Sequence, residues 1–115
     1  MTTPKLAEES CAACDARTPR LTPDEAKRLA ADVPAWEIAP DGASLHRRWV
    51  LRDFATAVAF VQQIAVVADK ENHHPDVHIT GYKHLAIDLS THAIGGLSRN
   101  DFILAAKIDA LPPAT

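Results

Sequence analysis

The stretch that decides the fold is Asp69–Asp101, DKENHHPDVHITGYKHLAIDLSTHAIGGLSRND, which contains five of the six histidines. Within it, Val77–Thr80 and His84–Thr91 are typical of strands and are joined through Gly81. The second segment alternates apolar and polar residues, as expected of a strand with one buried face. The stretch therefore predicts a β-hairpin at the centre of the fold.

A helix precedes this hairpin. Apolar residues recur at helical spacing over Phe54–Ala68, and Asp53 can cap the first turn. Pro75 lacks an amide hydrogen and crowds the residue before it, so the helix cannot extend past His74. His73 and His74 therefore lie at a junction between a helix and a strand.

Another helix follows the hairpin. Gly95-Gly96 supplies a tight turn, and Ser98-x-x-Asp101 resembles a capping box, in which two side chains satisfy the first amide hydrogens of a helix. Pro112-Pro113 ends this helix, because proline cannot continue it. The sequence thus predicts helices on both sides of the central hairpin.

The earlier part of the chain predicts one more helix and one more hairpin. Thr22-Pro23-Asp24-Glu25 combines a capping Thr, a Pro at the first helical position and a Glu three residues after the cap, and the helix runs to about Ala31. Pro40-Asp41-Gly42 is a turn signal between the predicted strands Trp36–Ile38 and Ser44–Leu51.

The predicted order is helix, two strands, helix, two strands, helix. It indicates an α+β fold in which a four-stranded antiparallel sheet is covered by helices on one face. The opposite face is left open to water or to another subunit. Because 115 residues of which 47% are hydrophobic suffice for one core and not for two, we expect residues 21–115 to form a single domain.

The first residues show no apolar periodicity, and we expect residues 1–20 to be a disordered or mobile tail, of which residues 1–18 are dispensable for folding and turnover. Both cysteines, Cys11 and Cys14, lie in this segment. A structural zinc site needs four ligands, and the chain has no second such pair to supply them. We therefore expect reduced thiols.

Charge and hydropathy exclude several classes of partner. The net charge is -3 and the charged residues are scattered, so we expect no direct contact with nucleic acid. The longest mainly apolar stretch, Phe54–Ala68, is too short to span a bilayer, and the N-terminus lacks the apolar run of a signal peptide. We expect a cytoplasmic protein.

Imidazoles near neutral pH suit proton transfer, because their unperturbed pKa is about 6.5. His73, His74 and His92 lie at predicted ends of elements, at the edges of the sheet where pockets form. Metal binding is the rival use, but adjacent histidines in an extended backbone point apart and no full ligand set is present, so we expect no metal site. The remaining histidines are interpreted as solvated: His46, His78 and His84.

Two carboxylates are candidates for orienting these imidazoles. Asp69 lies near the end of its helix, where a negative charge opposes the helix dipole, and this cost favours a reason beyond solvation. A carboxylate within reach of a ring nitrogen would fix the tautomer of the imidazole. Asp101 can cap its helix, belong to the site, or do both.

These residues together carry a resemblance. Their order and spacing resemble the pterin-4a-carbinolamine dehydratase family, whose pattern is an acidic or basic residue, three positions, His-His-Pro, an aromatic, a His at the end of a strand and an Asp beyond it. The resemblance covers the chain from the helix start at Thr22 onward. Val77 departs from it, since some relatives have a tryptophan there, near the pterin. The matching residues are Asp69, His73, His74, Pro75, Tyr82, His92 and Asp101.

The resemblance implies an enzyme, a hydro-lyase that converts 4a-hydroxytetrahydropterin to quinonoid dihydropterin and water. The pterin is the substrate, and no cofactor or metal is implied. In the family this reaction recycles the pterin of aromatic amino acid hydroxylases, which are possible partners, and the chains form homodimers or homotetramers. The alternative is a dimerisation cofactor or interaction protein of the same fold.

The resemblance also implies roles for single residues. His73, His74 and His92 match the catalytic residues of the family. Among them we assign proton transfer to His73 and His92, and substrate positioning to His74. Supporting or substrate-binding roles are implied for Asp69, Pro75, Tyr82 and Asp101.

Overall fold

The computed structural model describes residues 6–12 and 17–112. Within them, none of the helices combines the length and apolar composition that crossing a membrane requires. The elements follow the predicted order, with two short 3-10 helices added, and the predicted α+β fold is confirmed. The elements are η1 (Leu6–Glu8), α1 (Pro23–Ala30), β1 (Glu37–Ile38), β2 (Leu45–Val50), α2 (Phe54–Glu71), β3 (Asp76–Thr80), β4 (His84–Leu89), η2 (His92–Ile94) and α3 (Arg99–Asp109).

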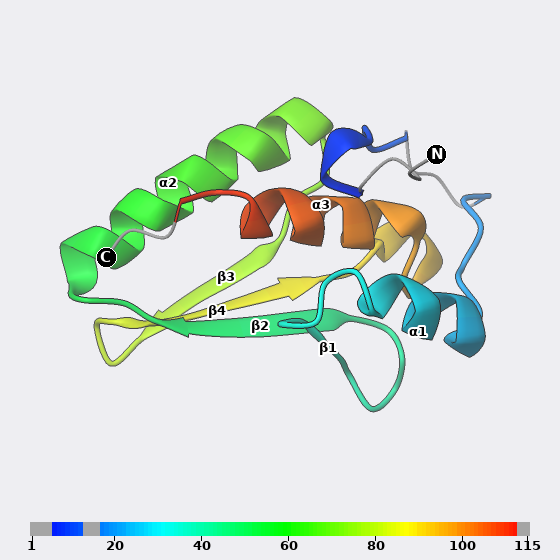
Figure 1. The fold of residues 1–115 in the computed structure, drawn as a ribbon, viewed down its shortest axis with the longest axis horizontal. Helices are drawn as coiled ribbons and strands as arrows, with labels where there is room; N and C mark the ends of the chain where they lie inside the picture. The colour runs from blue at the N-terminus through cyan, green and yellow to red at the C-terminus, as the bar shows by residue number, and fades with distance from the viewer. Residues whose placement is uncertain (1–5, 13–16, 113–115) are drawn as a thin grey trace.

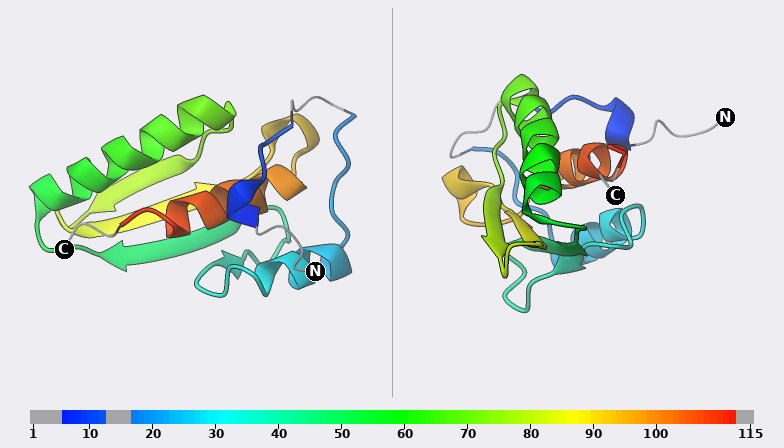
Figure 2. Two further views of the ribbon diagram at one scale, coloured as in Figure 1. Left: turned by 45° about the horizontal axis from the view of Figure 1, so that its top comes forward. Right: turned by 90° about the vertical axis from the view of Figure 1, so that its left-hand side faces the viewer.

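The strands form one antiparallel sheet in the order β1-β2-β4-β3. Both predicted hairpins form, and they are joined because β2 pairs with β4 from Leu45↔Leu89 to Val50↔His84. Helices α2 and α3 lie together on one face of this sheet (Figure 1), as the turned views also show (Figure 2). The other face carries no helix of the described chain, so the predicted arrangement of layers is confirmed.

The core lies between the sheet and these two helices. The predicted alternation along β4 is confirmed, because Leu85, Ile87 and Leu89 are buried, whereas Ala86 and Asp88 are partly buried and His84 is exposed. Burying each large apolar side chain stabilises the fold by about 1.5–3 kcal/mol. The side chains that meet here include Leu85, Ile87 and Leu89 from the sheet, Phe60 and Ile64 from α2, and Phe102 and Leu104 from α3.

The predicted helix starts are confirmed by their caps. Thr22 Oγ1 accepts a hydrogen bond from the amide of Glu25, and Glu25 Oε1 accepts one from the amide of Thr22, at 3.2 and 2.9 Å. Asp53 Oδ1 accepts from the amide of Thr56 at 2.8 Å. The hydrogen bonds with Thr22 and Thr56 also lower the pKa of both carboxyls, Glu25 and Asp53, because they stabilise the ionised form.

The N-terminal residues differ from the expected tail. Residues 6–12 lie against the domain: Leu6 is buried in the core, and the amide of Cys11 donates to Glu71 Oε1 at 2.8 Å. One apolar anchor and a few backbone hydrogen bonds achieve this docking without any periodic pattern. Cys14 lies outside the described residues.

Candidate active site

A pocket of about 290 Å³ lies where β3 begins and β4 ends. These two ends meet because the strands are antiparallel, with Asp76 opposite Asp88. The topology therefore brings the His-His-Pro segment beside the residues that follow β4. The pocket is lined by Asn72, His73, His74, Pro75, Asp76, Ser90, Thr91, His92 and Ala93.

The turn at Asn72 directs the chain into this pocket. Asn72 adopts a left-handed conformation with φ 51° and ψ 40°, which ends α2, and its amide donates back to the Ala68 and Asp69 carbonyls. Asparagine tolerates this conformation better than most residues other than glycine. His73 follows directly and leaves the helix toward the interior, where its side chain is only 8% exposed.

His73 and Asp101 form a buried pair. The distance between His73 Nε2 and Asp101 Oδ1 is 2.6 Å, and the Asp101 side chain is fully buried. A carboxylate can only accept, so Nε2 carries the hydrogen and Nδ1 is the proton acceptor of the neutral ring. Asp101 thus fixes the tautomer of His73, as a carboxylate does in many acid-base sites.

Asp101 also caps the start of α3. Its Oδ2 accepts from the amide of Ser98 at 3.0 Å and from Thr91 Oγ1 at 2.8 Å, and the hydroxyls of Thr91 and Ser98 lie 2.7 Å apart. The capping box is therefore present, and the same carboxylate serves both the helix and the histidine. Such a charge is tolerated in the interior because both oxygens have hydrogen-bond donors.

His74 also pairs with a carboxylate, but at the surface. Its Nε2 lies 2.9 Å from Asp69 Oδ1, and the two side chains are 58% and 77% exposed. Asp69 lies one turn back on α2, so its position near the end of the helix places it beside this imidazole. The structure thus gives each of the adjacent histidines its own carboxylate.

His92 reaches the pocket from a loop. The expectation that it closes a strand was wrong: β4 ends at Leu89, and His92 begins the 3-10 helix η2. The loop is closed because the amide of Thr91 donates to the carbonyl of Gly96 at 2.8 Å, and Gly95 adopts the left-handed φ of 59° that this tight turn requires. The His92 side chain is exposed at the mouth of the pocket.

The structure does not bring Tyr82 to this pocket. Tyr82 lies in the turn between β3 and β4, at the opposite end of the hairpin, with 60% of the residue exposed. The side chain beside its ring is Lys83, whose Nζ lies 5.7 Å from the ring centre. Pro75, by contrast, lines the pocket.

Thr91 and Ser98, which were not predicted as site residues, donate hydrogen bonds to Asp101 of the buried pair. Both are nearly fully buried, at 1% and 2% exposure. A signal was present for Thr91, because it continues the inward-facing alternation of Leu85, Ile87 and Leu89. A buried hydroxyl needs a hydrogen-bond partner, and Asp101 is that partner.

A second group of histidines lies on the open face of the sheet. His46 Nδ1 lies 2.6 Å from Asp88 Oδ1, Arg48 Nε donates to His46 Nε2 at 3.0 Å, and His78 Nε2 lies 3.5 Å from Asp88 Oδ2. His46 is therefore a partnered side chain and not simply solvated, whereas His84 is exposed. Among residues 6–12 and 17–112, no three His, Cys, Asp or Glu side chains converge in a way that could hold a metal ion.

Comparison with known proteins shows the family to which the chain belongs. The family model described as "Pterin 4 alpha carbinolamine dehydratase" matches residues 19–111. The chain is 42% identical over 109 residues to "Pterin-4-alpha-carbinolamine dehydratase 2, mitochondrial" of Arabidopsis thaliana, covering 92% of this chain and 58% of that protein. It is 38% identical over 106 residues to a provisionally named pterin-4-alpha-carbinolamine dehydratase of Halorhodospira halophila, covering 92% and 96% of the two chains.

A solved structure is also similar. The crystal structure of a transcriptional coactivator/pterin dehydratase from Brucella melitensis superposes with a TM-score of 0.75 at 29% identity, covering 84% of this chain and 100% of that one. The family match spans both hairpins, α2, α3 and the whole pocket, and it leaves out only the N-terminal residues and the last few. The chain belongs to the pterin-4-alpha-carbinolamine dehydratase family.

Proposed function

We propose that this protein dehydrates 4a-hydroxytetrahydropterin to quinonoid dihydropterin and water. Family membership supports the reaction class, and the observation that carries the proposal is the buried His73–Asp101 pair in a pocket that His74 and His92 share. The pocket is lined by imidazoles from two segments, the one that follows α2 and η2. Elimination of water needs proton transfer at two places.

The chemistry balances with two imidazoles. The C4a–O bond breaks with its electron pair going to oxygen, which takes a proton from an acid and leaves as water. The adjacent ring nitrogen forms a C=N bond with its lone pair and releases its own proton to a base. The pterin supplies both electron pairs, so these steps call on the protein only for an acid and a base.

His73 suits the base and His92 the acid. With its hydrogen on Nε2 held by Asp101, neutral His73 presents Nδ1 as the proton acceptor, and the carboxylate stabilises the imidazolium that forms. His92 is exposed at the mouth, where it can exchange its proton with water between turnovers. His74, held by Asp69, positions the substrate.

The test is to replace His73 and His92 with Ala, singly and together. Each single change is expected to slow dehydration by about 10²–10⁴-fold, because one general acid or base contributes that factor. The substrate is generated by an aromatic amino acid hydroxylase, and the rate is compared with the uncatalysed reaction, with and without a chelator. His84→Ala is the control, since His84 is exposed on the open face. Near-normal turnover in the double variant, or loss of wild-type activity on chelation, contradicts the proposal.

A second candidate function is a scaffold for partner binding. The open sheet face favours it, because that face carries Arg48, His46 and Asp88 around a hollow of about 620 Å³ and no helix of the described chain covers it. The name of the Brucella relative, which joins coactivator and dehydratase, is consistent with such a role. A wild-type protein that does not accelerate dehydration above the uncatalysed rate would favour the scaffold.

We also propose that the protein is a homodimer or homotetramer. The open face and the edge strands β1 and β3 leave sheet surface to be covered by another copy. Light scattering at micromolar concentration is expected to show a multiple of the 12.4 kDa chain mass. A species of 12.4 kDa alone would contradict this.

A further inference from the structure

Residues 6–12, here called the N-terminal strap, lie outside the part of the chain that the family model matches, residues 19–111. In the structure, the strap runs beside α3 and reaches the end of α2 (Figure 2). Its contacts therefore need an explanation that the family match does not supply.

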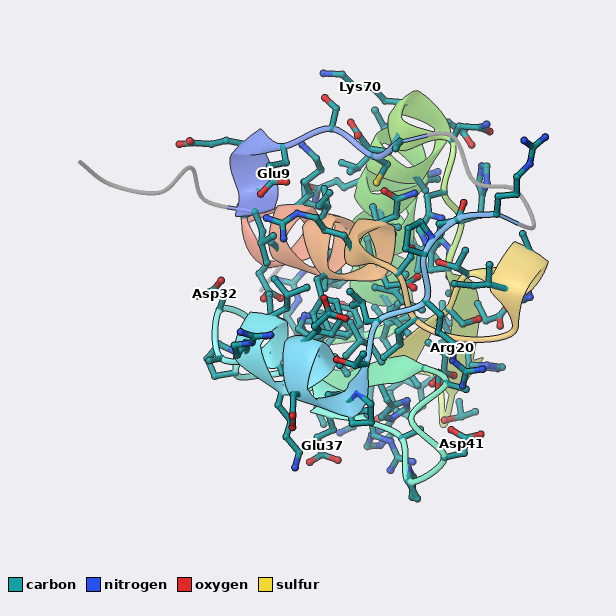
Figure 3. All side chains as sticks on the ribbon, turned by 90° about the vertical axis from the view of Figure 1, so that its right-hand side faces the viewer. Glu9, Arg20, Asp32, Glu37, Asp41 and Lys70 are labelled. Atoms are coloured by element: carbon teal, nitrogen blue, oxygen red, sulfur yellow. The ribbon has the colours of Figure 1, made fainter. Side chains whose placement is uncertain are left out.

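One end of the strap is anchored along α3. Leu6 is buried at 4% exposure, and Lys107 Nζ donates to the carbonyl of Ala7 at 2.9 Å. Glu9, which lies on the strap beside α3 (Figure 3), accepts two hydrogen bonds from the guanidinium of Arg99 at 2.8 and 2.7 Å. These contacts hold this end of the strap against α3.

The other end bridges the two segments that carry the buried pair. The amide of Cys11 donates to Glu71 Oε1 at 2.8 Å. The Asn100 side chain bonds Ala12 in both directions, accepting from its amide at 3.0 Å and donating to its carbonyl at 2.7 Å. Two consecutive strap residues thus contact the end of α2 and the start of α3.

Those two contact points lie next to the site. Glu71 is the last residue of α2, two positions before His73, and Asn100 directly precedes Asp101. The hydrogen bond between His73 and Asp101 joins the same two segments from the inside, at 2.6 Å. The strap and the buried pair therefore both connect the segment at the end of α2 to the start of α3.

We propose that the strap is a positioning element for the His73–Asp101 pair, with Asn100 as its principal positioning residue. By fixing the start of α3 against the end of α2, it keeps the imidazole within the narrow range, about 0.5 Å, that acid-base work requires. This inference deepens the proposed dehydratase function and rests on it. The strap acts through the pair and touches no substrate.

The main variant is Asn100→Ala, which removes both bonds to Ala12 and leaves His73 and Asp101 unchanged. We expect kcat to fall by about tenfold or more while KM changes by less than about threefold, because positioning acts on the chemical step. The matched control is Glu9→Gln, which weakens the strap at the end away from the buried pair and is expected to keep kcat within about twofold.

A second readout is independent of turnover. A short N–H···O bond to a carboxylate gives a strongly downfield imidazole proton resonance, which His73→Ala identifies by its loss. We expect Asn100→Ala to shift or broaden this resonance and Glu9→Gln to leave it unchanged. If wild-type protein shows no dehydration, the proposed function fails, and this resonance still tests the strap.

Ala12→Pro provides a variant outside α3, since proline has no amide hydrogen to donate to Asn100. It is expected to lower kcat and to shift or broaden the resonance, as Asn100→Ala is. It therefore tests the proposal even if Asn100→Ala does not fold. Should a folded Asn100→Ala or Ala12→Pro protein keep kcat and the downfield resonance at wild-type values, the strap contributes only to stability and the proposal is overturned.

Discussion

Two consecutive histidines hold the same chemical partner in opposite surroundings. His73 pairs with Asp101 at 2.6 Å with the side chains 8% and 0% exposed, whereas His74 pairs with Asp69 at 2.9 Å with the side chains 58% and 77% exposed. The distances differ little. The surroundings therefore decide what each pair contributes, because water and salt screen the outer pair while the inner pair is held in a medium of low dielectric.

The two pairs also differ in what supports them. Asp101 lies 28 residues from His73 in sequence and is held in addition by Thr91 and Ser98. Asp69 lies in the last turn of α2, five residues before its partner, which follows the end of that helix. The inner pair thus joins segments far apart in the chain, while the outer pair joins residues that are close in sequence.

The largest expected difference is in stability. Asp101→Ala is expected to lower the free energy of unfolding by about 3–5 kcal/mol, because it leaves buried groups without their acceptor. Asp69→Ala is expected to change it by less than about 0.5 kcal/mol. Urea unfolding at neutral pH measures both. Equal losses in the two variants would show that burial does not separate the pairs.

The second-largest expected difference between the two pairs is in the rate of turnover. Asp101→Asn preserves size but removes the charge that stabilises the His73 imidazolium, so kcat is expected to fall by about 10²-fold, at the low end for a general base. Asp69→Asn is expected to cost less than about threefold, since His74 is exposed and its pair is weak. Steady-state dehydration assays compare the two variants, and a larger loss for Asp69→Asn would exchange the roles of the two histidines.

Salt should sharpen the contrast. Raising NaCl from about 0.05 M to about 1 M shortens the Debye length to about 3 Å, which screens exposed charges. In double-mutant cycles, the coupling energy of His74 with Asp69, about 1 kcal/mol or less, is expected to approach zero. The coupling of His73 with Asp101 is expected to persist, because solvent ions do not reach it. A coupling at the inner pair that also vanishes would mean that the pair opens to solvent.

The smallest expected effect concerns a third pair, on the strap. The hydrogen bonds from Arg99 lower the pKa of Glu9 from its ordinary 4.5. A lowered folded-state pKa gives stability that is present above the unfolded pKa and is lost as the pH falls through the folded value. Glu9→Gln is therefore expected to reduce the stability lost between about pH 6 and about pH 3, by only a few tenths of a kcal/mol because the pair is half-exposed. Urea unfolding at the two pH values measures this difference.

Much of the fold could be predicted from local signals in the sequence. Pro75, the cap residues Thr22 and Asp53, and the turn at Gly81 each act within a few residues, so their consequences could be predicted without a structure. Pairing of β2 with β4 could not be read in the same way. That pairing depends on which hairpin faces fit together around the core, a contact between segments far apart in the chain.

In the site, too, the features set by local sequence could be predicted, and those set by contacts between distant segments could not. His73, His74 and His92 converge because two antiparallel strand ends meet, which follows from the hairpin that the sequence predicts. The same hairpin sends Tyr82 to the far end, although the family pattern groups it with the histidines. The strap was missed because a lone Leu6 makes no periodic pattern, and its docking depends on partners far away in the chain.

The order in which the chain is synthesised adds a consequence of the strap. Ala12 meets Asn100 across 88 residues, and Ala7 meets Lys107 across 100, so residues that are made early bind a helix that is made much later. During synthesis the contacts between the strap and α3 cannot form until α3 has left the ribosome, and contacts of such long sequence separation form late and slowly. The strap can therefore complete its docking only after α3 has been made, and this docking is one of the last steps in the folding of the newly made chain.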